Sequence, residues 1–197
     1  MKDCVSKSIW IILPIVFFSL LSYASAKQKQ TKSMIAEFYE SEGSAYLEKR
    51  QYDKAIFNFN RAIEMNTADA SAYYNRGRAY GEQGQYDQAI SDYTKALEIN
   101  RMYGDTYFYR GLAYHAKGQY NQAISDYTKA LEINPGDGGT YYARGFTYYL
   151  RGEYLKSLVD IKKAESLGYP IHPRILNDLV SDFATQDRKK NKTLSSN

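Results

Sequence analysis

Apolar and small residues recur along this chain at intervals of 34 residues. The segment 85–100 returns at 119–134 with a single substitution. Within each interval the aromatic and small positions lie three, four and seven residues apart, which places them on one face of a helix. Gly84, Gly118 and Gly152 separate two such segments in the later intervals. The pattern therefore predicts a series of helical hairpins.

Small and aromatic residues occupy fixed places in the 34-residue unit. The eighth place is always glycine, at Gly43, Gly77, Gly111 and Gly145. Tyrosines hold the fourth, eleventh and seventeenth places of all four units, which accounts for twelve of the 21 tyrosines. A small residue between two aromatic ones lets a second helix approach closely. Because one hairpin cannot bury its apolar face alone, neighbouring hairpins are expected to stack.

The period, the aromatic and glycine places and the alanines at places twenty and twenty-seven resemble the tetratricopeptide repeat. The resemblance covers residues 36–171, in four repeats bounded at 36–69, 70–103, 104–137 and 138–171. One departure is Ser157, which replaces the first alanine of repeat four. The resemblance implies an all-α fold, a right-handed α-solenoid of four helix-turn-helix repeats.

The amino-terminal segment 1–26 has the three parts of a secretory signal. Two lysines precede an apolar run at 9–21, and an alanine-serine-alanine cleavage sequence follows at 24–26. The run is shorter than the roughly 20 residues that a helix needs to cross a bilayer. We therefore expect export to the periplasm or the medium, with cleavage between Ala26 and Lys27. The alternative is a membrane anchor formed by an uncleaved apolar run.

Three further segments flank the repeats. Residues 27–35 are expected to be a polar linker before repeat one. Apolar residues recur at helical spacing after Pro173, so 172–186 is expected to form a helix that caps repeat four. The basic segment 187–197 is expected to be a disordered tail.

The positive charge of the chain lies at its two ends. Cleavage of the signal lowers the formal net charge from +4 to +3, and residues 27–32 and 187–192 each carry +3. Residues 33–186 are therefore close to −3. This distribution excludes the basic folded face that nucleic-acid-binding proteins use. We expect no nucleic-acid partner and only weak, salt-dependent contact of the basic tails with anionic membrane surfaces.

Residues suited to catalysis are scarce. The only cysteine, Cys4, lies in the expected signal, and the only histidines are His115 and His172. The sequence has no glycine-rich phosphate loop and no histidine-glutamate pair at metal-binding spacing. We therefore predict a non-enzymatic protein without catalytic residues, cofactor or metal site. An enzyme would require a small-molecule site between the cap helix and repeat four.

Opposite charges recur at the seventh and twenty-third places of repeats two to four. The pairs are Arg76 and Asp92, Arg110 and Asp126, and Arg144 and Asp160. Repeat one has Glu42 and Asn58 instead, so the two places change together. We hypothesise an ion pair that links the two helices of each hairpin, the alternative being a pair between adjacent repeats.

The resemblance also implies that the first helices of the repeats line a concave groove. Repeat one places acidic residues there, including Glu37 and Glu40, whereas later repeats place mainly aromatic ones. Such a wall is more apolar than folding requires, which is typical of a surface that binds a peptide or a partner helix. The candidate partner-binding residues are Tyr74, Asn75, Arg78, Phe108, Tyr109, Leu112, His115, Tyr142, Phe146 and Tyr149.

Two functions are compatible with this pattern. The first is an exported, non-catalytic scaffold that binds a peptide or helix segment of a protein partner in the groove. The second is a structural subunit of a cell-envelope assembly that packs through its convex face or its ends, with the groove covered by its own cap helix or 27–35. Some family members hold a peptide carboxyl terminus with a clamp of basic and amide residues. Only Asn75 matches that clamp and Glu40 replaces a lysine, so the acidic first repeat favours a basic or neutral segment.

Overall fold

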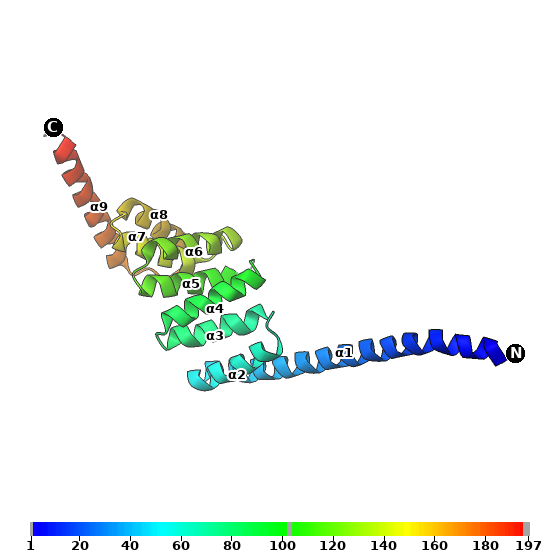
Figure 1. Cartoon of the computed structure of the whole chain (residues 1–197). Helices are drawn as coiled ribbons and strands as arrows, with labels where there is room; N and C mark the ends of the chain where they lie inside the picture. The colour runs from blue at the N-terminus through cyan, green and yellow to red at the C-terminus, as the bar shows by residue number, and fades with distance from the viewer. Residues whose placement is uncertain (1, 102–103, 195–197) are drawn as a thin grey trace. The chain divides into compact units, whose positions relative to one another are not determined.

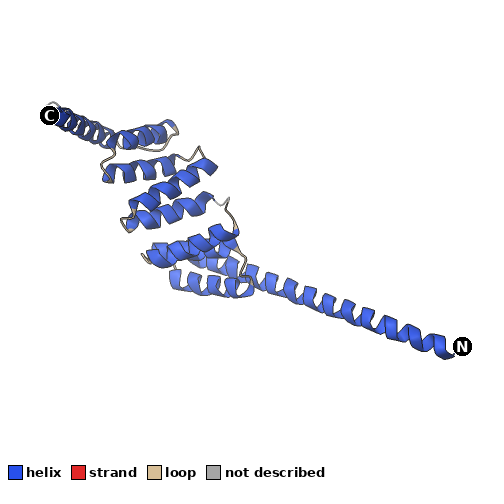
Figure 2. Ribbon diagram, turned by 45° about the horizontal axis from the view of Figure 1, so that its top comes forward, coloured by secondary structure: helices blue, strands red, loops and turns tan. Residues whose placement is uncertain are grey.

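The structure is a computed structural model that describes residues 2–101 and 104–194, with side chains for 18–101, 104–186 and 188. In these residues nine helices occur and no strand, which confirms the expected all-α repeat architecture (Figures 1 and 2). The helices are α1 (Lys2–Glu48), α2 (Tyr52–Met65), α3 (Ala70–Glu82), α4 (Tyr86–Ile99), α5 (Gly104–Ala116), α6 (Tyr120–Ile133), α7 (Gly138–Leu150), α8 (Tyr154–Ser166) and α9 (Pro173–Leu194). They form two compact units, Met1–Ala68 and Asp69–Asn197.

The first unit is a hairpin of α1 and α2. A methyl group at Gly43 of α1 would lie 2.7 Å from the Phe59 ring of α2, so glycine permits this contact. Helix α1 continues through the expected signal and the expected linker at 27–35 as one helix. No glycine or proline occurs between Pro14 and Gly43, so nothing in that stretch ends the helix.

The second unit contains three hairpins of similar geometry, α3–α4, α5–α6 and α7–α8, followed by α9 (Figure 2). Gly84, Gly118 and Gly152 follow the first helix of each hairpin with φ values of 74°, 72° and 73°. Glycine adopts this left-handed conformation without a steric cost, so it ends one helix and reverses the chain. These are the chain breaks predicted from the sequence.

The glycines at the eighth place hold the two helices of a hairpin close together. A methyl group at Gly77 would lie 2.8 Å from the Tyr93 ring, and one at Gly111 would lie 2.6 Å from the Tyr127 ring. Both tyrosine rings are almost completely buried. In the first of these hairpins Tyr93 packs in one cluster with Ala89 and Ala96 of α4 and with Tyr74 of α3. The pattern of small and aromatic places is therefore a packing pattern, as expected.

Helix α9 packs on α8 at the end of the second unit and buries Leu179. It extends to Leu194, beyond the expected cap at 172–186 and into the segment 187–197, where the sequence predicts disorder. No glycine or proline follows Pro173, so the chain has no residue that would end the helix earlier.

Candidate functional site

The two helices of each hairpin in the second unit are joined by a bidentate ion pair. Arg110 donates from Nε and Nη2 to the two carboxylate oxygens of Asp126 at 2.7 and 2.8 Å. The pairs of Arg76 with Asp92 and of Arg144 with Asp160 have the same geometry, at 2.6–2.9 Å. The hypothesis that the pair lies within a hairpin is confirmed, and the alternative pairing between adjacent repeats is wrong.

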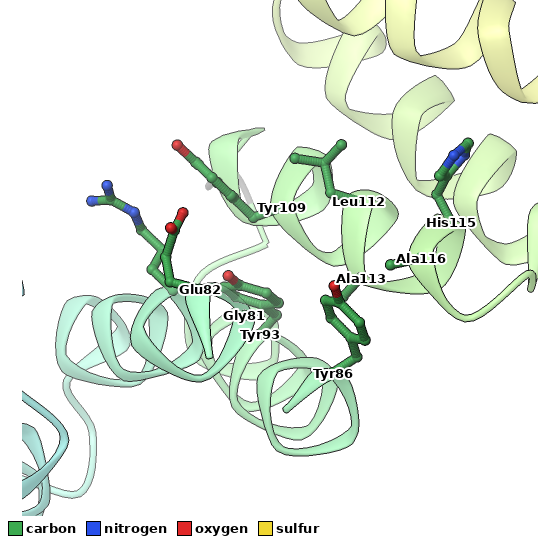
Figure 3. A pocket seen from close by; sticks show the side chains of 10 residues that line it. Gly81, Glu82, Tyr86, Tyr93, Tyr109, Leu112, Ala113, His115 and Ala116 are labelled. Atoms are coloured by element: carbon green, nitrogen blue, oxygen red, sulfur yellow. The ribbon is translucent and has the colours of Figure 1, made fainter. Parts of the chain in front are cut away.

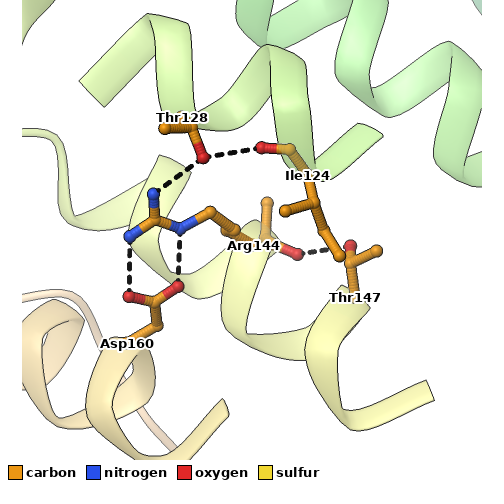
Figure 4. A network of polar contacts seen from close by, with 6 residues as sticks. Ile124, Thr128, Arg144, Thr147 and Asp160 are labelled. Atoms are coloured by element: carbon orange, nitrogen blue, oxygen red, sulfur yellow. Dashed lines mark hydrogen bonds and ion pairs between the residues drawn. The ribbon is translucent and has the colours of Figure 1, made fainter. Parts of the chain in front are cut away.

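Two of these arginines, Arg110 and Arg144, also contact the preceding repeat. Arg110 donates from Nη1 to the Thr94 hydroxyl at 3.0 Å, and Arg144 donates to the Thr128 hydroxyl at 3.0 Å (Figure 4). The Thr128 hydroxyl in turn donates to the carbonyl of Ile124 at 2.8 Å. The guanidinium groups of Arg110 and Arg144 therefore contact both their own hairpin and the hairpin before it.

These ion pairs are part of the scaffold and are unsuited to catalysis. The Asp126 side chain is 7% exposed and the Arg110 side chain 17% exposed. Burial alone would lower the pKa of Arg110, but the hydrogen bond and the charge of Asp126 outweigh burial and raise that pKa. The guanidinium also lies over the rings of Tyr107 and Tyr114, at 5.7 and 6.0 Å from their centroids. A carboxylate that is buried and held by two charge-assisted hydrogen bonds from one guanidinium is suited to joining the two helices.

Helices α3, α5 and α7 carry all of the candidate partner-binding residues, and we call this side of the second unit the first-helix face. Among these candidates, Leu112 and Phe146 are the most exposed apolar side chains, at 37% and 41%. The remaining candidates other than Tyr74 are half-buried. An apolar surface of this kind is accessible to a partner.

Tyr74 does not face solvent, so that part of the prediction is wrong. The side chain is only 8% exposed. Its ring packs between the two adjacent hairpins, 6.2 Å from the Tyr93 ring and 5.8 Å from the Tyr109 ring. The physical reason is that the fifth place of repeat two points toward α5, so that Tyr93 of α4 and Tyr109 of α5 enclose the ring.

Aromatic rings run along α7 toward the end of the second unit. The Phe146 ring lies 6.5 Å from Tyr142 and 6.4 Å from Tyr149 in stacked orientations. Tyr142 also stacks on Tyr169 at 4.9 Å. One face of Tyr142 is thus occupied by the chain itself, whereas Phe146 remains accessible.

A pocket of about 320 Å³ opens between α3 and α5. Figure 3 shows Tyr86 and Tyr93 on its α4 side, and Tyr109 and Leu112 on its α5 side. Arg78 also lines the pocket, and its guanidinium lies 5.4 Å from the Tyr109 ring centroid and 5.7 Å from that of Tyr74. Four of the candidate residues, Arg78, Tyr109, Leu112 and His115, line this pocket, which the sequence did not predict.

His115 has a structural partner on the next hairpin. The Thr147 hydroxyl donates to the carbonyl of Ala143 at 2.7 Å, so it accepts a hydrogen bond from Nδ1 of His115 at 2.8 Å. The neutral imidazole therefore carries its proton on Nδ1 and presents Nε2 as an acceptor. Burial lowers the pKa of His115, which keeps the ring neutral near pH 7.

Helix α9 reaches only one end of the first-helix face. Tyr149 donates its hydroxyl proton to the carboxylate of Asp182 at 2.9 Å, and Gln186 donates to the carbonyl of Gly152 at 3.0 Å. A second, smaller pocket of about 130 Å³ lies there, lined by Phe146, Tyr149 and Leu179 among others. These α9 contacts fall at the end of α7 and in the turn that follows it.

Two other kinds of site were sought in the described residues. Within 18–101, 104–186 and 188, no three histidine, cysteine, aspartate or glutamate side chains are arranged to hold a metal ion. The described helices also include none that is both long and apolar enough to cross a membrane. The side chains of residues 1–17, where most of the expected signal falls, lie outside the described residues.

The repeated hairpins, their glycine contacts and their ion pairs define a helical-repeat protein of the all-α class. The family model of the tetratricopeptide repeat matches residues 70–103 and 104–137, and a second TPR repeat model matches 43–84. The chain thus contains tetratricopeptide repeats, with the boundaries expected for repeats two and three. The α7–α8 hairpin lies outside these matches but has the same ion pair.

Several solved structures have a similar fold. A crystal structure of MamA is 28% identical, covers 68% of this chain and 78% of its own, and has a TM-score of 0.66. The TPR domain of Arabidopsis OM64 is 29% identical, covers 59% and 96%, and has a TM-score of 0.58. The first TPR of Spaghetti (RPAP3), bound to the HSP90 peptide SRMEEVD, is 25% identical, covers 60% and 96%, and has a TM-score of 0.58. Comparison with curated protein sequences gave no match.

Proposed function

We propose that this protein is an exported, non-catalytic scaffold that binds a peptide or helical segment of another protein on its first-helix face. The observation that carries the proposal is the accessible apolar surface of Leu112 and Phe146, on the first helices of consecutive hairpins. Half-buried aromatic residues surround both side chains. Apolar surface that folding does not bury is typical of binding surfaces.

Peptide binding by similar folds supports the proposal. The RPAP3 repeat domain holds an HSP90 peptide that ends in acidic residues. The present chain has Glu40 where the clamp of such domains has a lysine, and only Asn75 matches the clamp. We therefore propose a ligand that is recognised by apolar contacts, and not by its carboxyl terminus.

Export is proposed from the layout of 1–26 alone. Cleavage would leave a mature chain that begins at Lys27 and lacks cysteine. Mass measurement of the protein in separated cell fractions tests this step. A mature chain from Lys27 in the periplasm or medium supports export, and a full-length chain in the membrane fraction supports the anchored alternative.

A structural subunit with a covered groove is the second candidate, because α9 contacts the end of α7. The hydrogen bond from Tyr149 to Asp182 and the buried Leu179 both favour it. Those contacts leave Leu112, on the neighbouring hairpin, exposed. The interaction scaffold is therefore the better supported of the two.

The test is photo-crosslinking in cells from position Leu112, with Gln122 on the opposite side of the α5–α6 hairpin as control. Gln122 is exposed, so a crosslinker there samples the same compartment. A discrete partner captured from Leu112 and not from Gln122 supports the scaffold. Adducts confined to α9 or to 27–35 of the same chain would contradict it and favour the structural subunit.

A further inference from the structure

The pocket between α3 and α5 exists because the twelfth place of repeat two is glycine. The other repeats have Leu47, His115 and Tyr149 at that place. A methyl group at Gly81 would lie 3.7 Å from the Tyr93 hydroxyl and 4.0 Å from the Ala89 methyl group. These are ordinary contact distances, so a side chain would fit and packing does not require glycine.

The contrast with Gly77, one turn earlier in α3, makes this glycine unusual. A methyl group at Gly77 would overlap the Tyr93 ring at 2.8 Å, so Gly77 is needed for helix packing. Gly81 has no such constraint, although glycine stabilises a helix less than alanine does. Its structural effect is to leave an open pocket of about 320 Å³ on the first-helix face.

The walls of the pocket have a specific chemistry. Tyr86, Tyr93 and Tyr109 supply three aromatic rings, and Leu112 supplies an exposed aliphatic side chain. The Arg78 guanidinium is held over the Tyr109 ring at 5.4 Å, and Glu82 also lines the pocket, so one positive and one negative side chain lie beside the aromatic rings. The negative face of an aromatic ring is complementary to such a cation and to the edges of the neighbouring rings.

We propose that the pocket beside Gly81 receives one aromatic side chain of the partner segment. This inference rests on the proposed function and names the feature of the ligand that is recognised. An aromatic side chain from an extended or helical segment on the first-helix face would enter between α3 and α5. There it would pack against Tyr86 and Tyr109 with its face toward Arg78.

The test is selection of peptides from a random library displayed on phage, using the chain as the cell processes it. Wild type and two variants are compared. Gly81→Leu introduces the residue that repeat one has at this place and fills the pocket, whereas Gly81→Ala adds only a methyl group that has room. Thermal unfolding shows whether each variant folds, and Arg78→Gln provides a second change that removes the charge at the pocket while Gly81 is kept.

We expect selected peptides to share one phenylalanine, tyrosine or tryptophan. Gly81→Leu should weaken their binding by about tenfold or more, Gly81→Ala by no more than about twofold, and replacement of the peptide aromatic by leucine by about fivefold. Arg78→Gln should reduce the preference for aromatic over leucine. Peptides that depend on Leu112 and Phe146 but share no aromatic residue, or that bind Gly81→Leu unchanged, would overturn this inference and leave the proposed function standing. Failure to select any peptide that depends on Leu112 and Phe146 would refute both.

Discussion

The ion pair of the last hairpin offers the sharpest test of how this scaffold is held together. We consider Arg144→Ala, Asp160→Ala and the double variant. The guanidinium makes two hydrogen bonds to Asp160 and one to Thr128 of the preceding repeat. Either single change therefore leaves a charged group without its partner in a mostly buried place.

The size of the effect follows from burial. The Asp160 side chain is 6% exposed and the Arg144 side chain 17% exposed. Loss of one member of such a pair is expected to lower the free energy of unfolding by about 3–5 kcal/mol, because the remaining charge is uncompensated. Arg144→Ala also removes the hydrogen bond to Thr128, at a cost of about 1 kcal/mol. The double variant leaves neither charge, so we expect a coupling energy of about 2–4 kcal/mol.

Urea unfolding followed by circular dichroism measures these free energies. The variants can be compared when the slope of the unfolding free energy against urea concentration, the m-value, is the same for all of them. The matched control is the pair of Lys95 and Glu98 on α4, whose side chains are 50% and 60% exposed. Its coupling energy should be much smaller than that of the buried pair, because water screens the exposed charges. A coupling energy for Arg144 and Asp160 as small as that of the control would refute the argument from burial.

Three further predictions use the same measurements and the crosslinking assay. Gly111→Ala should lower the free energy of unfolding by about 1–3 kcal/mol, since its methyl group would lie 2.6 Å from the Tyr127 ring; unchanged urea unfolding would contradict this. Burial lowers the pKa of His115 in the folded chain below the ordinary value of 6.5, which the unfolded chain keeps. The unfolded chain therefore binds more protons at a pH between the folded and unfolded pKa values, and the free energy of unfolding falls as the pH falls through 6.5. His115→Gln should reduce that loss between pH 7.5 and pH 5.5, and an unaltered pH dependence would count against it. Phe146→Ser should change stability by less than about 1 kcal/mol because the ring is 41% exposed, yet it should reduce partner capture from Leu112; full capture would exclude Phe146 from the binding surface.

The sequence predicted the hairpins and their internal contacts because each depends on residues at fixed spacing. Glycine at the eighth place and an aromatic ring at the twenty-fourth meet in every hairpin in which both occur, as in Gly111 and Tyr127. The arginine and aspartate of a hairpin are 16 residues apart, and they pair because the turn brings those two places together. Repeat one replaces both residues together, and this joint change was enough to predict that they pair.

The candidate site was predicted only in part. The sequence did not indicate that Thr147 binds His115 or that Thr128 binds Arg144. The places of these residues in the repeat show no pattern that would pair them. A threonine on a helix usually bonds its own backbone, so only the stacked neighbour reveals the second bond. The signal for the pocket was present in Gly81, where the other repeats have larger residues, but a missing side chain does not by itself show whether neighbours fill the space.

The sequence by itself thus determined the period, the helical hairpins, the close glycine contacts and the ion pairs within each hairpin. These features depend on residues joined by a short turn, and their geometry follows from helical spacing. Only the tertiary structure decided that Tyr74 is buried, that Arg110 and Arg144 contact the hairpin before their own, and that a pocket opens beside Gly81. Each of these depends on how one hairpin packs on the next, and that packing is set by the shapes of side chains from two repeats together.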